Sequence, residues 1–205
     1  MAASTIPSLT SDRLAVPPEP VLPLTVGQYH EMVRAGILAE GEPIELLEGW
    51  LVGKMTKDPP HTLSVGCTYD TLRQLVGPIW HVRSEGPITT GDSEPEPDIS
   101  VIRGRRRDFV DRHPGPSDVA LLVEVADASL ERDRGWKKQI YAAARIPVFW
   151  IVNLVDRQVE VFTQPSGPGK QPDYATGQVF AASDAIPVVL DGREVGTIAV
   201  SELLP

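Results

Sequence analysis

The sequence predicts an α/β fold in which a central mixed β-sheet is flanked by three helices and followed by extra strands near the C-terminus. Residues 119–126 are apolar on both faces apart from one carboxylate, which is typical of a central strand. Segments with helical periodicity lie between such strand-like runs. Hydrophobic residues make up 41% of the 205-residue chain and aromatic residues only 6%, so a single core must consist mainly of Val, Leu, Ile and Ala.

Composition distinguishes the first 23 residues from the rest of the chain. Residues 1–23 hold five prolines among small polar residues, and we expect them to form a flexible Pro-rich arm. One domain should then occupy residues 24–205. It begins with a helical pattern over residues 24–40, for which Thr25 is a suitable N-terminal cap.

Strands and one helix are expected in the middle of the chain. Residues 44–52 have the pattern of a hairpin that turns at Glu48 and Gly49. A helix is expected over residues 61–76, after Pro59 and Pro60. A strand is expected over residues 98–102, directly after Pro97.

The C-terminal half contains the third helix and most of the remaining strands. The helix is expected over residues 129–145, with Ser129 as its cap and Pro147 beyond its end. Further strands are expected at residues 148–152, 158–163, 178–181, 186–190 and 197–200.

Charge and cysteine content exclude several classes of protein. The formal charge of -9 argues against indiscriminate phosphate binding, so any contact with nucleic acid must be local. The lone Cys67 excludes an intramolecular disulfide framework and favours a cytoplasmic location. No run approaches the roughly 18–20 apolar residues of a membrane span, so we expect no membrane contact. The candidates for a local nucleic-acid contact are the basic residues Arg103, Arg105, Arg106 and Arg107.

Glu124 is the most unusual residue of the chain, because it interrupts an apolar strand. A buried carboxylate costs several kcal/mol unless a cation meets it. Asp98 begins the strand after Pro97, and two carboxylates on neighbouring strands form an oxygen-rich site suited to Mg²⁺ or Mn²⁺. Such an ion could activate water for attack on a phosphodiester.

An amine on the following helix could complete this site. Lys137 shares a helical face with Asp133 and Tyr141 at four-residue steps, and this face should pack on the sheet. The neighbouring Lys138 competes for the role, but it lies about a hundred degrees away around the helix. We therefore expect Lys137 to face the two carboxylates.

These residues resemble the PD-(D/E)xK signature of restriction-endonuclease-like nucleases. In the usual pattern a lysine follows the second acid by two residues, whereas this chain has Ala126 there and a lysine on the helix. This arrangement is similar to the Uma-type family of restriction-endonuclease-like proteins, and the resemblance covers about residues 24–163. It rests on Glu45 in Ile44–Leu51, His61, Pro97-Asp98, Val123–Ser129 around Glu124, Asp133 to Lys137 to Tyr141, and Arg145–Asn153.

The resemblance implies a restriction-endonuclease-like core and a Mg²⁺-dependent (or Mn²⁺-dependent) endonuclease that hydrolyses phosphodiester bonds of DNA. It implies that Asp98 and Glu124 are metal ligands, that Glu45 assists the metal or its water, and that Lys137 orients the nucleophile. A homodimer is a further expectation, because two-fold symmetry suits the cleavage of both strands of a duplex. The chain departs from the family pattern at Asp127-Ala128-Ser129, where Ser-Pro-Ser is usual, and at Asn153, which replaces an aspartate.

Several alternatives remain open at this point. Glu124 could form a structural ion pair with Lys137 or an arginine, Glu45 could be a surface acid, and the arginines could be a solvated loop. His61 is interpreted as a residue of the helix start and is left out of the site. The rival function is a nuclease-like domain that binds nucleic acid or a protein partner without cutting. Paired carboxylates also serve glycosidases, which do not need the lysine.

Overall fold

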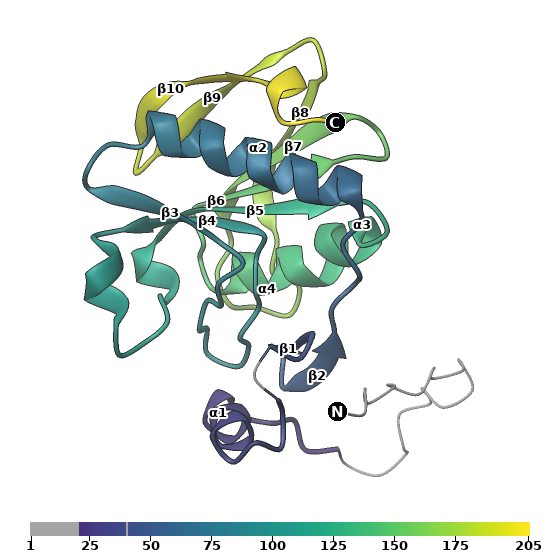
Figure 1. Cartoon of the computed structure of the whole chain (residues 1–205), viewed down its shortest axis with the longest axis vertical. Coiled ribbons are helices and arrows are strands. Elements are labelled where there is room, and N and C mark those ends of the chain that lie inside the picture. The colour runs from purple at the N-terminus through teal and green to yellow at the C-terminus, as the bar shows by residue number, and fades with distance from the viewer. Residues whose placement is uncertain (1–20, 40) are drawn as a thin grey trace.

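A computed structural model describes residues 21–39 and 41–205, and most of the expected arm over residues 1–23 lies outside these ranges. Its central feature is a six-stranded sheet with strand order β3-β4-β5-β6-β7-β8 (Figure 1). These strands are β3 (Trp80–Ser84), β4 (Ile99–Arg103), β5 (Val119–Ala126), β6 (Val148–Asn153), β7 (Gln158–Pro165) and β8 (Tyr174–Ala181).

The sheet is mixed, as expected, because one neighbouring pair of strands is parallel. Strands β5 and β6 run parallel, while the other pairs are antiparallel. The connection from β5 to β6 is helical, which is the usual way to join parallel neighbours. Two further hairpins lie outside the sheet: β1 (Ile44–Leu47) with β2 (Trp50–Gly53), and β9 (Ala185–Leu190) with β10 (Arg193–Ala199). The expected extra C-terminal strands are thus confirmed.

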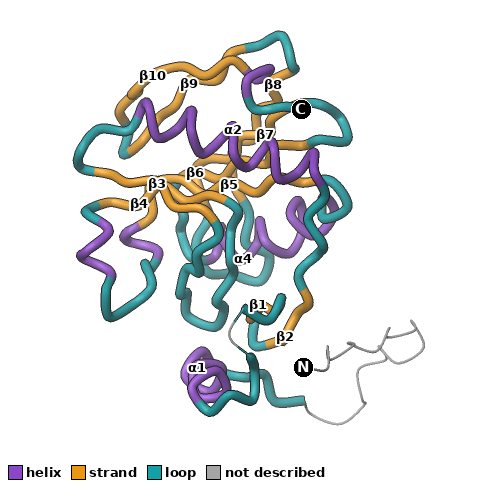
Figure 2. The backbone as a smooth tube through the Cα atoms, in the orientation of Figure 1, coloured by secondary structure: helices purple, strands orange, loops and turns teal. Residues whose placement is uncertain are grey.

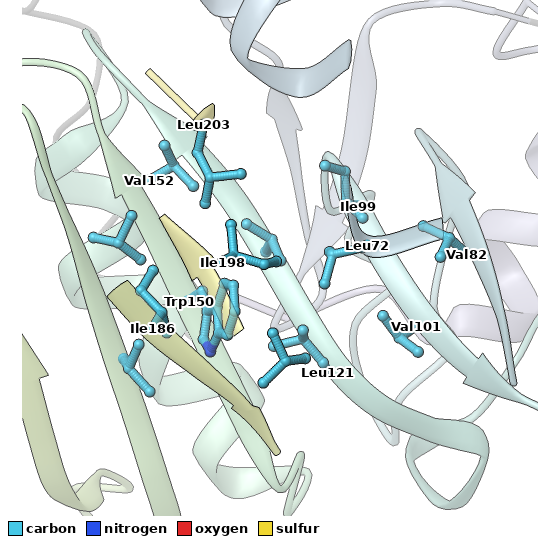
Figure 3. Close-up of a cluster of buried hydrophobic side chains, with 14 of the residues drawn as sticks. Leu72, Val82, Ile99, Val101, Leu121, Trp150, Val152, Ile186, Ile198 and Leu203 are labelled. Atoms are coloured by element: carbon cyan, nitrogen blue, oxygen red, sulfur yellow. The ribbon is translucent and has the colours of Figure 1, made fainter. Parts of the chain in front are cut away.

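Helices cover both faces of the sheet, as Figures 1 and 2 show. Helix α2 (Pro59–Leu75) and the β9–β10 hairpin pack on one face, where Leu72, Trp150, Ile186 and Ile198 share an apolar core (Figure 3). Helix α4 (Lys138–Ala143) packs on the other face. The sheet therefore has two buried faces, which explains why β5 is buried at every position.

The first two helices differ from the expected bounds. Helix α1 covers only Val26–Arg34 within the expected 24–40, because Gly36 adopts a left-handed φ of 70° just beyond its end. The expected cap is confirmed, since the Thr25 hydroxyl accepts from the N–H of Gln28. Helix α2 begins at Pro59, because proline fits the first turn of a helix, where no N–H is needed.

The third helix is interrupted in a way that the sequence analysis missed. A short α3 (Leu130–Arg132) leads into a π-helical segment over Asp133–Lys137, which continues into α4. Ser129 occupies the N-cap position, as expected, but its dihedral angles are already helical and its side chain makes no capping hydrogen bond. Single π-helical turns often occur at functional sites, because they change the direction of side chains.

The β1–β2 hairpin turns at Glu48 and Gly49, which both have positive φ, as expected. A Cβ on Gly49 would lie 2.8 Å from the carbonyl oxygen of Leu24, so the approach of the preceding chain requires glycine here. An isolated bridge between Leu46 and Glu94 ties the hairpin to the segment before β4. This bridge sets the position of the neighbouring Glu45.

Within the described ranges, no helix is long and apolar enough to cross a membrane.

Candidate active site

Four carboxylates and one ammonium group gather in a buried cluster at one end of the sheet. Glu45, Asp98, Glu124 and Asp133 are at most 8% exposed, and Lys137 is 3% exposed. Together they line a pocket of about 210 Å³. The structure thus brings the four predicted residues together and adds Asp133 to them.

Strand pairing places Asp98 beside Glu124. Strands β4 and β5 are antiparallel with Ile99 opposite Val123, so the adjacent residues Asp98 and Glu124 are neighbours across the sheet. The N–H of Val125 donates to Asp98 Oδ2 at 2.9 Å, which fixes the carboxylate at the strand end. The expectation that the two acids lie on adjacent strands is confirmed.

Alternation along β5 directs Glu124 toward α4. Leu122 and Ala126, two residues before and after it, pack in the core on the α4 side, and Val123 and Val125 pack in the opposite core. Glu124 Oε1 therefore meets two donors from the helical connection: Lys137 Nζ at 3.0 Å and the Tyr141 hydroxyl at 2.6 Å.

Glu45 reaches the cluster from the separate β1–β2 hairpin. Its Oε2 lies 3.3 Å from Lys137 Nζ and accepts from the N–H of Glu96 at 3.1 Å. Glu45 is fully buried, so it is not a surface acid. Lys137 is consequently held between Glu45 and Glu124. Lys138 points elsewhere, to Asp173 at 3.0 Å, and does not line this pocket.

The cluster carries more negative than positive charge, and this changes the pKa values of its members. Burial, together with Asp133, Asp98 and Glu45, raises the pKa of Glu124 to about 8 against the opposing effect of Lys137. Burial likewise raises the pKa of Asp133. For Lys137, burial favours the neutral amine, but Glu124, Glu45 and Asp133 outweigh burial and raise its pKa, so Lys137 stays protonated.

Two side chains that were not expected in the site, His61 and Lys57, lie on the other side of Asp98. His61 Nε2 lies 3.3 Å from Asp98 Oδ2, and Lys57 Nζ lies 3.6 Å from Asp98 Oδ1. Burial opposes ionisation of Asp98, but the contacts with His61 and the Val125 N–H lower its pKa overall. The residue that caps α2 is Asp58, so His61 is free to face the site. The signal that could have found His61 is its place after the proline pair in the family pattern.

The donors of this pocket fit a hard divalent cation. Glu45 Oε1 and Asp133 Oδ1 are buried without a hydrogen-bond partner in the described structure, and the guanidinium of Arg132 lies no closer than 4.0 Å to either oxygen, so their negative charge is only partly met. No three His, Cys, Asp or Glu side chains among the described residues converge closely enough to bind a metal ion by themselves. Mg²⁺ commonly binds one or two carboxylates and keeps several waters, so Asp98 and Glu124 could hold it without a third side chain.

The four predicted arginines, which lie at the end of β4 and just after it, are away from this pocket and mostly have partners of their own. Arg103 pairs with Asp191, and Arg105 pairs with Asp108 at 2.9 Å. Arg106 donates to the carbonyl oxygen of Val82 at 2.8 Å. None of the four predicted arginines lines the pocket, because β4 separates them from Asp98. Asn153 also lies outside it and donates to Glu160 at 2.9 Å.

Comparisons with known proteins agree with this fold. The model of the Uma2 family, described as "Putative restriction endonuclease", matches residues 26–198. The chain is also similar to the crystal structure of a "putative nuclease belonging to DUF820" from Anabaena variabilis ATCC 29413. That similarity has a TM-score of 0.66 at 18% identity, covers 88% of this chain and 97% of the other, and shows a shared fold. No curated protein sequence is significantly similar to this chain. Because the family match spans most of its length, the protein belongs to the Uma2 family of putative restriction endonucleases.

Proposed function

We propose that this protein is a divalent-metal-dependent endonuclease that hydrolyses phosphodiester bonds of DNA. Membership of the family supports a nuclease function in general. The observation that carries the finer proposal is the excess of buried carboxylates around one protonated amine, in a pocket open to a ligand. Such a cluster is costly to the fold and is relieved by a bound cation.

Asp98 and Glu124 are the residues that would hold Mg²⁺ or Mn²⁺. Two donors occupy Glu124 Oε1, which leaves the second oxygen available, and the Val125 N–H orients Asp98. When bound, the ion would supply Lewis-acid polarisation of a phosphoryl oxygen and a lower pKa for a coordinated water.

Lys137 is suited to donate a hydrogen bond rather than to accept a proton. An ammonium group has three N–H bonds, of which Glu124 and Glu45 take two. The third can orient an attacking water or stabilise charge on the phosphate. Glu45 acts as a positioning residue for Lys137, and Tyr141 does the same for Glu124.

Cleavage of supercoiled plasmid tests this proposal. With Mg²⁺ or Mn²⁺, the protein should convert supercoiled DNA into open circles, and chelation should stop the reaction. Asp98→Ala and Lys137→Ala should each lower the rate by at least roughly a hundredfold, as expected for the loss of one charge-stabilising group. The matched control is Lys138→Ala, whose side chain lies outside the pocket and whose loss should leave cleavage unchanged.

Two results would contradict this function. Cleavage that persists unchanged in Asp98→Ala and Lys137→Ala would show that these residues do not form the catalytic site. Tight DNA binding without cleavage in either metal would favour the non-cutting rival.

We also propose a cytoplasmic protein that acts on duplex DNA as a homodimer. Sedimentation of the protein with a short duplex should then show twice the protomer mass, and a monomer on DNA would overturn this part.

A further inference from the structure

We propose that Lys57 binds a phosphate oxygen of the DNA backbone at the mouth of the acid pocket. This inference rests on the proposed nuclease function and deepens it, because it names a contact between the protein and the anionic substrate. An acidic pocket repels DNA even when a metal ion offsets part of its charge. A cation of the protein must therefore meet the backbone near the pocket.

Lys57 is the most accessible cation that lines the pocket. The cations that line it are Lys54, Lys57, Arg132 and Lys137, besides His61. The side chain of Lys137 is only 4% exposed, those of Arg132 and Lys54 are 21% and 26% exposed, and that of Lys57 is 36% exposed. Lys57 can thus touch a ligand that arrives from solvent more readily than the nearly buried Lys137 can.

The other two cations of the pocket wall are held by buried or half-buried partners. Lys54 forms a close ion pair with Glu96, whose side chain is 24% exposed. Arg132 lies 4.0 Å from both Glu45 and Asp133, which are buried, and donates to the carbonyl oxygen of Gly53. Moving either cation to a phosphate would leave a partly or fully buried carboxylate unpaired, which is costly.

Lys57 has a partner that a phosphate can replace at little cost. Its Nζ lies 2.8 Å from Glu85 Oε1, and the Glu85 side chain is 55% exposed. An exposed ion pair contributes about 0–1 kcal/mol, so Glu85 can return to solvent when Lys57 turns to a stronger anion. The second contact, 3.6 Å to Asp98 Oδ1, keeps the ammonium beside the reacting groups.

The position of Lys57 in the chain suits this role. It lies just before the start of α2, which is close to α3 at the pocket end of the sheet (Figure 1). The arginines after β4 are at the other end of that strand. Five residue steps of extended chain lead from Asp98 to Arg103, roughly 16 Å at about 3.3 Å per residue. The backbone of Arg103 therefore lies far from the phosphate that Lys57 and the acid pocket would share.

Binding of a fluorescein-labelled 20-base-pair DNA duplex, with Ca²⁺ present, tests this proposal at several salt concentrations. Lys57→Gln should weaken binding and reduce the slope of log affinity against log salt by about one, as for the loss of one phosphate contact. Lys57→Arg keeps the charge and should restore most of the slope. Thermal unfolding would verify that each variant is folded.

Glu85→Gln separates phosphate binding from a merely structural role of Lys57. If Lys57 only held Glu85 in place, both Lys57→Gln and Glu85→Gln would weaken binding. The proposal predicts the opposite sign for Glu85→Gln, namely tighter binding, because it removes a competitor of the phosphate. Lys170→Gln, which changes an exposed cation outside the pocket, is the control and should leave affinity near that of the parent protein.

The outcomes also separate this proposal from the function on which it rests. If the parent protein cuts and binds DNA but Lys57→Gln keeps the full salt slope, the role of Lys57 is overturned and the nuclease function stands. If Glu85→Gln weakens binding as much as Lys57→Gln, the role is again overturned. A parent protein that neither binds nor cuts DNA would overturn both proposals.

Discussion

The acid pocket and the basic residues after β4 both stand out as charged in the sequence, but the fold treats them differently. In the pocket, four buried carboxylates surround Lys137, and two of their oxygens lack a hydrogen-bond partner among the described residues. After β4, the exposed Arg105 is already paired with Asp108, and Arg103 with Asp191. Buried charge that a fold leaves unmet indicates a missing ligand, whereas exposed and paired charge does not.

The energies of the two regions differ in the same sense. Removing one partner from a buried ion pair typically costs 3–5 kcal/mol. Exposed pairs contribute about 0–1 kcal/mol. Substitutions in the two regions should therefore differ in their effects on both stability and cleavage, and the following predictions are ordered by the size of that difference.

The largest effect is expected for Lys137→Met, which removes the counter-charge of Glu124 and Glu45. The free energy of unfolding at pH 8, measured by urea denaturation, should fall by about 3 kcal/mol, and cleavage should be lost. The double variant Lys137→Met with Glu124→Leu should regain most of the stability but none of the cleavage. A stable and active Lys137→Met protein would show that the two regions do not differ.

Metal binding should stabilise the protein only through the acid pocket. At a hundred times the dissociation constant, Mn²⁺ should add about 2.7 kcal/mol, or roughly 5–10 °C in Tm for a chain of this size. Asp98→Asn should abolish this increase, and Arg107→Gln should retain it. An equal Mn²⁺ effect in all three proteins would place the ion elsewhere.

Much of this contrast could be predicted from the sequence, because it depends on patterns that short segments carry. The apolar run of β5 identifies a central strand, so Glu124 had to be buried. Helical phase distinguishes Lys137 from Lys138, and the structure agrees, with the first in the pocket and the second paired with Asp173. For the exposed Arg107, no pattern in the sequence indicated which way its side chain faces.

Other parts of the site depend on tertiary placement and could not be predicted. The π-helical turn over Asp133–Lys137 has no periodic signature, because it replaces one regular turn inside a helix. Lys57 reaches Asp98 only because the chain between β2 and α2 lines the pocket. No local pattern shows that the chain follows this path.

A smaller effect is expected for Tyr141→Phe, which removes one of the two donors to Glu124 Oε1. Stability should fall by about 1–2 kcal/mol, and cleavage by roughly tenfold, because Lys137 still holds the carboxylate. Tyr174→Phe is the matched control, since its buried hydroxyl donates to the carbonyl oxygen of Ile146 at 3.0 Å, away from the pocket. It should lose similar stability and no activity. Equal losses of activity in both variants would contradict a role for Tyr141 in positioning Glu124.

The smallest effects are expected in the basic region. Arg105→Gln and Arg107→Gln should each change the free energy of unfolding by less than about 0.5 kcal/mol, as is usual for exposed positions. Plasmid cleavage by these variants should stay within about twofold of the parent protein. A large loss of cleavage in either variant would contradict this expectation, because it would show that the exposed arginines are needed for activity.

A crystal structure of the protein soaked with Mn²⁺ would test the central claim most directly. The account predicts an anomalous peak within bonding distance of a carboxylate oxygen of Asp98 and one of Glu124, with Lys137 still in place beside it. A map without a peak between these two side chains, at Mn²⁺ concentrations that support DNA cleavage, would contradict it.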